Sequence, residues 1–509
     1  MILLSRFFNP QSPPTSKLRR ASAILGRRPA RRTSSLAGES SPGVGGRNLP
    51  LRCLFRFLNP QSAIGNPQLI GCLIAITAFM LCMGSGVGSL QAMPPVERTV
   101  LPNHLVLLVS QEHSLPFVTF QLLIDAGSRN DPSGEEGLAN QTARGLLLGT
   151  SKRSVTAINQ ELDFMGALLN ASCGKDYGAL SLKVLKKDLD KGLDLFWEVL
   201  TQPTFPEDEI RREVEKTVAA IQSQEDRPDI VAEKAFEKAL FLESPYAHPV
   251  EGTKESLPRV TRDAVRRFYQ AHYRPSSAIL AVVGDITAEE VKSKLLPRLT
   301  QWTMEKVPKA PFVSHFAKEQ KTVKIDRQIS QANVILGHAG VARENPDFYA
   351  LTVMNYILGG GGLTSRLVEE IRNRRGLAYV VESFFDPHKY PGSFQLILQT
   401  KNSSAREAIS ISLQEMERIR KEPVSEKELE GAKKYLIGSF PMRLDTQSKL
   451  ANFLTQVEYF GLGLDYPEKY SSLIGSITRE DVLQVAKTYL HPEEYILVVV
   501  ANLKEAGME

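Results

Sequence analysis

Apolar residues recur along this chain with two spacings, which predict amphipathic helices in some segments and strands in others. Residues 206–224 and 425–436 predict helices, because each begins with Pro or Ser followed by acidic residues and then carries spaced apolar positions. Shorter apolar runs rich in β-branched residues predict strands. The clearest of these runs are Val106–Ser110, Phe117–Ala126, Asn333–His338 and Ser393–Thr400. Both kinds of element occur in both halves, so we expect an α+β protein whose helices cover one face of each sheet.

A long segment of the chain occurs twice. Residues 260–285 align without a gap with residues 477–502, at an offset of 217 residues. Each copy reads as a helix, a turn marked by Pro, and a buried strand. Thr261 and Thr478 stand where the N-cap of each helix is expected. The matching order over this length predicts two homologous halves.

The composition is that of a globular protein, and its charge is unevenly placed. The chain has 509 residues, of which 42% are hydrophobic and 23% charged, and its net charge is +5. Residues 1–66 carry a net charge of +10 and residues 67–92 carry none, which leaves −5 for residues 93–509. Nucleic-acid binding by the folded part therefore has no electrostatic support.

The first 95 residues predict a targeting segment ahead of the fold. Arg52 and Arg56 precede an uncharged apolar stretch within residues 69–91, as the positive region of a signal peptide precedes its apolar core. This pattern favours export, to the periplasm for instance, with cleavage near Ala92. The stretch is also long enough to remain as a membrane anchor. An organellar transit peptide is the alternative, because the start of the chain is basic and poor in acidic residues.

Several short motifs follow one another in a fixed order, and together they resemble the insulinase, pitrilysin and mitochondrial-processing-peptidase family over about residues 96–504. In the first half they are Val100-Leu101-Pro102-Asn103-His104-Leu105, Ala126-Gly127-Ser128-Arg129, Gly137-Leu138-Ala139, Leu148-Gly149-Thr150, Glu251-Gly252-Thr253 and Gly284-Asp285. In the second half they are Leu358-Gly359-Gly360-Gly361-Gly362, Ser365-Arg366-Leu367 and Arg375-Gly376-Leu377-Ala378-Tyr379.

The resemblance implies two homologous domains, each a mostly antiparallel sheet covered by helices. Two such pairs of domains, on one chain or two, enclose a chamber in this family like the halves of a clamshell. On this basis we expect a first peptidase-like domain at 96–301, a linker at 302–322 and a second peptidase-like domain at 323–509.

Active members of the family carry an inverted zinc motif, His-x-x-Glu-His, on a helix just after the Gly-Leu-Ala. Two His four residues apart share one helix face and can reach one zinc ion, while the Glu acts as a general base. The matching positions here are Asn140, Ala143 and Arg144, and the third ligand position, seventy-six residues after Arg144, is Ala220. All four positions are changed, so the resemblance implies no zinc cofactor and no catalytic residue in this chain.

No other chemistry in the sequence replaces the lost motif. The eight histidines are spread so that no two lie within five residues of each other, and a site assembled from distant positions is the alternative. Cys173 has no local signature of a nucleophile and reads better as a structural thiol. Gly359–Gly362 lacks the Lys-Ser/Thr of a phosphate loop. It resembles the glycine-rich loop of the non-catalytic processing-peptidase subunit, and a plain turn between helices is the alternative.

Two peptide-binding features of the family have counterparts here. The family holds substrate carbonyl groups with an Arg and a Tyr seven residues apart, which match Arg372 and Tyr379. It also pairs an edge strand of the first domain with the substrate backbone. The matching stretch is 166–172, where the small and polar residues Asn170 and Ala171 would let another strand approach; an ordinary edge strand is the alternative.

These features together predict a non-catalytic subunit of a zinc metallopeptidase complex. The chain would bind a peptide or unfolded protein and complete the chamber of a zinc-bearing homologous partner. One alternative is an active zinc metalloendopeptidase with a rebuilt site, which needs ligands that the sequence does not offer. The other is a structural or assembly subunit with no role in peptide binding.

Overall fold

The computed structural model describes residues 93–299, residue 302 and residues 312–509. Residues 1–92 of the predicted targeting segment, with its apolar run at 69–91, lie outside the described residues, as do residues 303–311 of the predicted linker. Within the described ranges, none of the helices combines the length and the apolar composition needed to span a bilayer.

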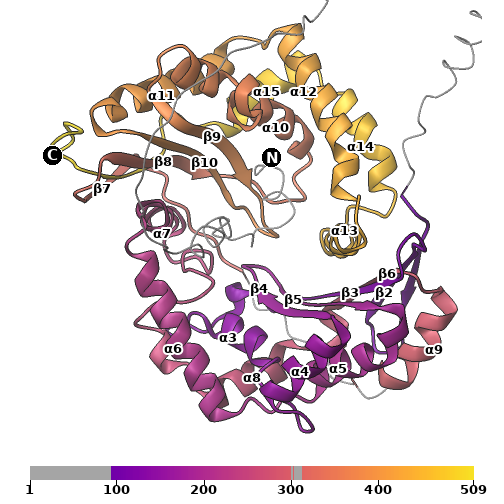
Figure 1. The fold of residues 1–509 in the computed structure, drawn as a ribbon. Helices are drawn as coiled ribbons and strands as arrows, with labels where there is room; N and C mark the ends of the chain where they lie inside the picture. The colour runs from indigo at the N-terminus through magenta and orange to yellow at the C-terminus, as the bar shows by residue number, and fades with distance from the viewer. Residues whose placement is uncertain (1–92, 300–301, 303–311) are drawn as a thin grey trace, which may run out of the picture. The chain divides into compact units, whose positions relative to one another are not determined.

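The first half of the chain contains a sheet of six strands in the order β1-β2-β6-β3-β5-β4 (Figure 1). β2 and β6 run parallel, and the other neighbouring pairs are antiparallel. β4 therefore lies at one edge of the sheet, beside β5. The strands are β1 (Val96–Val100), β2 (Val106–Gln111), β3 (Phe117–Ile124), β4 (Leu168–Cys173), β5 (Gly178–Leu185) and β6 (Ala278–Gly284).

The second half repeats this topology with five strands in the order β7-β11-β8-β10-β9. β7 and β11 run parallel and the other pairs are antiparallel, so β7 to β11 correspond in turn to β2 to β6. The prediction of two homologous α+β domains is confirmed. β7 starts at Lys321, which lies within the last two residues of the predicted linker. The strands are β7 (Lys321–Asp326), β8 (Gln331–Ala339), β9 (Ala378–Asp386), β10 (Ser393–Lys401) and β11 (Ile496–Ala501).

Both predicted N-caps of the repeated helices are confirmed. The Thr261 hydroxyl accepts the Ala264 N–H, and the Thr478 hydroxyl accepts the Asp481 N–H. The first half has α3 (Leu138–Gly145), α4 (Val155–Met165), α5 (Leu189–Thr201), α6 (Glu207–Gln224), α7 (Pro228–Phe241), α8 (Arg262–His272) and α9 (Ala288–Leu299). The second has α10 (Phe348–Asn355), α11 (Ala405–Lys421), α12 (Glu426–Ser439), α13 (Gln447–Tyr459), α14 (Tyr466–Gly475) and α15 (Arg479–Tyr489).

The two halves exchange one helix each. α7 belongs to the first half by sequence but packs on β8 and β11 of the second sheet, where Phe236 joins a buried cluster with Ile335 and Val498. α13 of the second half packs in turn on β3 and β6 of the first sheet, where Leu454 joins a buried cluster with Ala281 and Val283 of β6. Each sheet is thus covered on one face by helices of its own half and on the other by a helix of the other half. The sequence predicted only the first of these two layers.

Candidate functional site

The start of α3 is fixed by the close approach of two of the sequence motifs. Gly137 has φ +97°, and a Cβ on it would lie 2.7 Å from the Glu251 carbonyl oxygen, so only glycine fits. Gly252 has φ +84° and approaches the Glu136 carbonyl in the same way. The Asp131 carboxylate accepts the N–H groups of Gly137 at 2.8 Å and Ala139 at 2.7 Å, and so caps the helix. No motif in the sequence indicated this role of Asp131.

The four degenerate zinc-motif positions lie on two helices that contact each other. Asn140, Ala143 and Arg144 are on α3, and Ala220 is on α6. Ala143 is buried in the first core, whereas Ala220 is exposed and the Arg144 side chain is 49% exposed. The spacing along the sequence therefore does place the family's ligand positions on neighbouring helices.

An ion pair and a hydrogen bond join α3 to α6 at this corner. The Arg144 guanidinium donates to the carboxylate of Glu213, which is buried about two turns before Ala220 on α6. Lys216 Nζ approaches the same carboxylate at 3.5 Å. Next to the ion pair, Gln141 Nε2 donates to Thr217 Oγ1 at 2.8 Å, and both side chains are buried. These contacts stabilise the two helices against each other without a metal.

The zinc ion that active members of the family bind does not fit these residues. Arg144 brings a permanent positive charge to one ligand position, and Ala220 brings no donor atom to another. Glu213 offers a carboxylate nearby, but it is engaged by two cationic side chains. Over the described ranges, no group of three or more His, Cys, Asp and Glu side chains gathers in a geometry that could hold a metal.

β4 presents the segment that was predicted to accept a peptide strand. It lies at the edge of the first sheet, and Leu168, Asn170 and Ser172 point to the exposed side while Leu169 is buried. Ala171 is partly buried between them. The prediction of an edge strand is confirmed, and peptide binding to it stays a prediction.

The second predicted peptide contact lies at the edge of the second sheet. Arg372 belongs to a short helical segment, η7 (Val368–Asn373), and Tyr379 to the edge strand β9. The Arg372 Cζ atom lies 5.1 Å from the centre of the Tyr379 ring. Tyr379 is 76% exposed, so its ring and hydroxyl face solvent. The structure thus brings the two residues together on the surface.

The two glutamates that precede Arg372 in the sequence form ion pairs with other arginines. Arg374 pairs with Glu369 at 3.1 Å and with Glu370 at 2.5 Å, and Arg375 pairs with Glu370 at 2.5 Å. Arg372 has no carboxylate partner among the residues that the structure describes. Its donors are therefore available to a ligand such as a peptide carbonyl group.

The glycine-rich segment packs against β9 behind these residues. A Cβ on Gly359 would lie 2.4 Å from Ser383 Oγ, and Ser383 itself donates to Asn355 Oδ1 at 2.8 Å. Gly362 has φ +57° and faces open space. Close packing and one left-handed turn account for glycine at these two positions.

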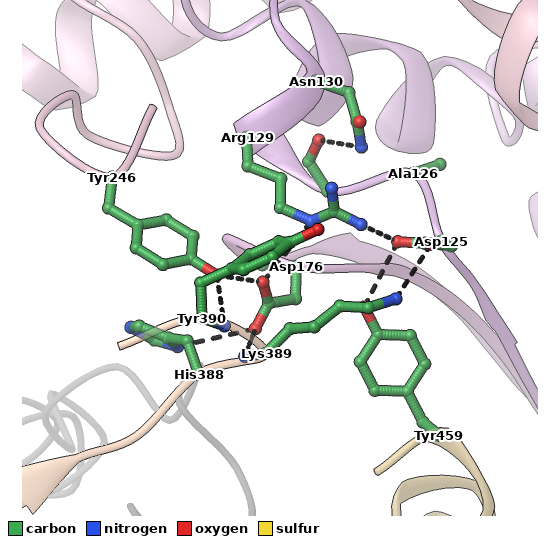
Figure 2. A network of polar contacts seen from close by, with 12 residues as sticks. Asp125, Ala126, Arg129, Asn130, Asp176, Tyr246, His388, Lys389, Tyr390 and Tyr459 are labelled. Atoms are coloured by element: carbon green, nitrogen blue, oxygen red, sulfur yellow. Dashed lines mark hydrogen bonds and ion pairs between the residues drawn. The ribbon is translucent and has the colours of Figure 1, made fainter. Parts of the chain in front are cut away.

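A partly buried polar network joins the turns that follow the edge strands β4 and β9 (Figure 2). In the β4–β5 turn, the Asp176 carboxylate accepts the Tyr246 hydroxyl and, at 2.9 Å, the Lys389 N–H of the β9–β10 turn. Lys389 Nζ reaches Asp125 at 3.2 Å, and the Tyr459 hydroxyl donates to the same carboxylate at 3.2 Å. The network therefore fixes β4 and β9 relative to each other.

The ring of His388 is buried in this network. It lies 3.7 Å from Asp176 and 3.4 Å from Asp386. Burial opposes protonation, but the two carboxylates outweigh it and raise the pKa of His388 above its ordinary value. Sequence reasoning missed the network, because its members are scattered along the chain and only the fold brings them together.

Comparisons with known proteins match both halves of the chain. Residues 106–254 match the family described as Insulinase (Peptidase family M16), and residues 259–436 match the one described as Peptidase M16 inactive domain. A crystal structure of a peptidase M16 inactive domain from Pseudomonas fluorescens has a TM-score of 0.73 and 27% identity, and covers 80% of this chain and 98% of its own.

Three relatives are similar over most of their length. An uncharacterised zinc protease from Streptomyces coelicolor is 29% identical over 82% of this chain and 91% of its own. A non-peptidase homologue from Helicobacter pylori is 24% identical over 84% and 98%. A probable mitochondrial-processing peptidase subunit beta from Arabidopsis thaliana is 23% identical over 81% and 79%. The changed zinc positions fit an inactive member, and the chain belongs to the insulinase family, peptidase family M16.

Proposed function

We propose that this chain is the non-catalytic subunit of a zinc metallopeptidase complex, in which it binds the peptide substrate. One contrast carries the proposal. At the degenerate zinc-motif positions, Arg144 forms an ion pair with Glu213. Arg372 and Tyr379, in contrast, stay together, with Tyr379 76% exposed and the neighbouring carboxylates engaged by other arginines. A chain with no peptide role would have no need to keep that pair accessible.

The geometry supports a division of labour between two sites on the chain. The edge of β4 offers backbone N–H and C=O groups that can pair with an extended peptide. Arg372 and Tyr379 offer N–H and O–H donors to peptide carbonyl oxygens. The Asp176–Lys389 hydrogen bond ties the turns of the two edge hairpins together, and we propose that one extended peptide engages both sites.

The partner in this proposal is a zinc-bearing homologue of similar size. The Arabidopsis relative is named as a processing-peptidase subunit, and the Helicobacter relative as a non-peptidase homologue. We propose that this chain combines the two descriptions: it is a subunit, and it is not itself a peptidase. We also propose that the complex works outside the cytoplasm, in the periplasm or at the membrane, because residues 1–95 read as an export signal or anchor.

Reconstitution tests this proposal. The chain would be purified alone and together with a zinc-bearing family member encoded in the same organism, and cleavage of unfolded protein would be measured for each chain and for the mixture. We expect a stable complex whose activity far exceeds that of either chain. A chain that cleaves peptides alone, or a complex that forms and gains no activity from this chain, would contradict the proposal; the second result favours an assembly role.

A further inference from the structure

Tyr379 is an extra residue in the pairing of β9 with β10. The two strands pair residue for residue from Ser393 opposite Asp386 up to Gln399 opposite Val380. The next pair is Thr400 opposite Ala378, so Tyr379 has no partner on β10. This is a β-bulge, a device that changes the direction of a side chain at the edge of a sheet.

The bulge decides which face of the sheet Tyr379 occupies. Val381 and Phe385 point into the second core, and strict alternation along the strand would send Tyr379 to the same side. Instead Ala378, 6% exposed, lies in that core and Tyr379 is 76% exposed. With regular pairing in place of the bulge, the Tyr379 ring would be directed toward the core.

Thr400 holds the backbone at this point. Its side chain is buried, and its hydroxyl donates to the Leu377 carbonyl oxygen at 2.6 Å. The Leu377 N–H donates to the Ile371 carbonyl at 2.9 Å, in the helical segment that carries Arg372. Leu377 thus connects the Arg372 segment to β10 through hydrogen bonds on both of its backbone groups, and Thr400 supplies one of them.

We infer that Thr400 is a positioning residue for the peptide contact made by Arg372 and Tyr379, because its hydroxyl holds the bulge that turns Tyr379 outward. The effect of Thr400 on cleavage rests on the proposed function. The effect of Thr400 on the position of the Tyr379 ring does not, because that position is a property of the chain alone.

The test compares Thr400→Val, which removes the hydroxyl at nearly constant shape, with Thr400→Ser, which keeps it. Thr455→Val is the matched control, because Thr455 is equally buried and its hydroxyl donates to a carbonyl, that of Asn452, at 2.8 Å. Each full-length variant would carry 3-fluorotyrosine at position 379 for fluorine NMR. Peptide cleavage would be measured in the complex with the zinc-bearing partner.

We expect Thr400→Val to move or broaden the Tyr379 resonance and to lower kcat/KM about ten- to a hundredfold. Thr400→Ser and Thr455→Val should leave both unchanged within about twofold. An unchanged resonance in folded Thr400→Val would overturn the positioning role. A displaced resonance with normal cleavage would uphold the positioning role and refute the proposed function of Tyr379. A Thr400→Ser variant as defective as Thr400→Val would overturn the inference, since the hydroxyl would not be the cause.

Discussion

Replacing Ile335 with alanine should destabilise both halves of the chain together, because α7 of the first half packs on the strand that carries this side chain. Ile335 is 3% exposed and lies in one buried cluster with Phe236 of α7. The change removes three carbon atoms at about 0.8 kcal/mol each. The cavity that remains adds to this loss, so we expect the free energy of unfolding to fall by about 3–4 kcal/mol.

Urea unfolding can show whether this loss is shared. The chain has two tryptophans, Trp197 and Trp302, and both belong to the core of the first half. With a urea slope of about 3 kcal/mol per molar, the midpoint seen by tryptophan fluorescence should fall by about 1 M, together with the midpoint seen by far-UV circular dichroism. Leu363→Ala, at a side chain that is 65% exposed, is the control and should leave both midpoints in place.

The result that would contradict this prediction is separate unfolding of the two halves. If circular dichroism shows an early transition in the Ile335→Ala protein while the fluorescence midpoint stays unchanged, the second half unfolds by itself. The exchange of α7 and α13 would then contribute little to cooperativity, and the reasoning from the shared cluster would be refuted.

Three further results are expected. Arg144→Ala should lower the free energy of unfolding by about 1–2 kcal/mol in urea titrations, because it leaves the buried Glu213 carboxylate with a weaker partner, and the solvent exposure of Arg144 limits the loss. Burial lowers the pKa of His338 to about 3, so the contribution of its neutral ring to the free energy of unfolding should fall by about 1.4 kcal/mol per pH unit as the pH drops from 6.5 toward 3, and the measured pH dependence of His338→Gln should differ from wild type by that amount. Metal analysis should find no stoichiometric zinc, and a chelator should leave Tm unchanged, since Ala220 provides no ligand.

The parts of the fold that depend on local pattern could be predicted from the sequence. The repeat at 260–285 and 477–502 predicted a capped helix and a buried strand in each half, because caps, Pro and apolar runs act over a few residues. The degenerate zinc positions came from the family resemblance, which supplied the spacing within and between the two helices.

Other features depend on partners that the sequence does not name. The apolar face of α7 shows that the helix is buried but not that it packs on the sheet of the other half. The bulge at Tyr379 depends on the register of β9 against β10, and strict alternation predicts the wrong face for the ring. The network around Asp176 joins residues from distant parts of the chain, so no local pattern could reveal it.

The most direct test of the account is peptide cleavage by the complex of this chain with its zinc-bearing partner, when Arg372→Ala or Tyr379→Phe is introduced in this chain alone. Loss of a donor that stabilises the transition state typically costs about 2–4 kcal/mol, so cleavage should slow by roughly two to three orders of magnitude. Complex formation and Tm should stay at the wild-type values, because Tyr379 is exposed and Arg372 has no described carboxylate partner to lose. Cleavage at the wild-type rate by an intact complex of either variant would contradict the account.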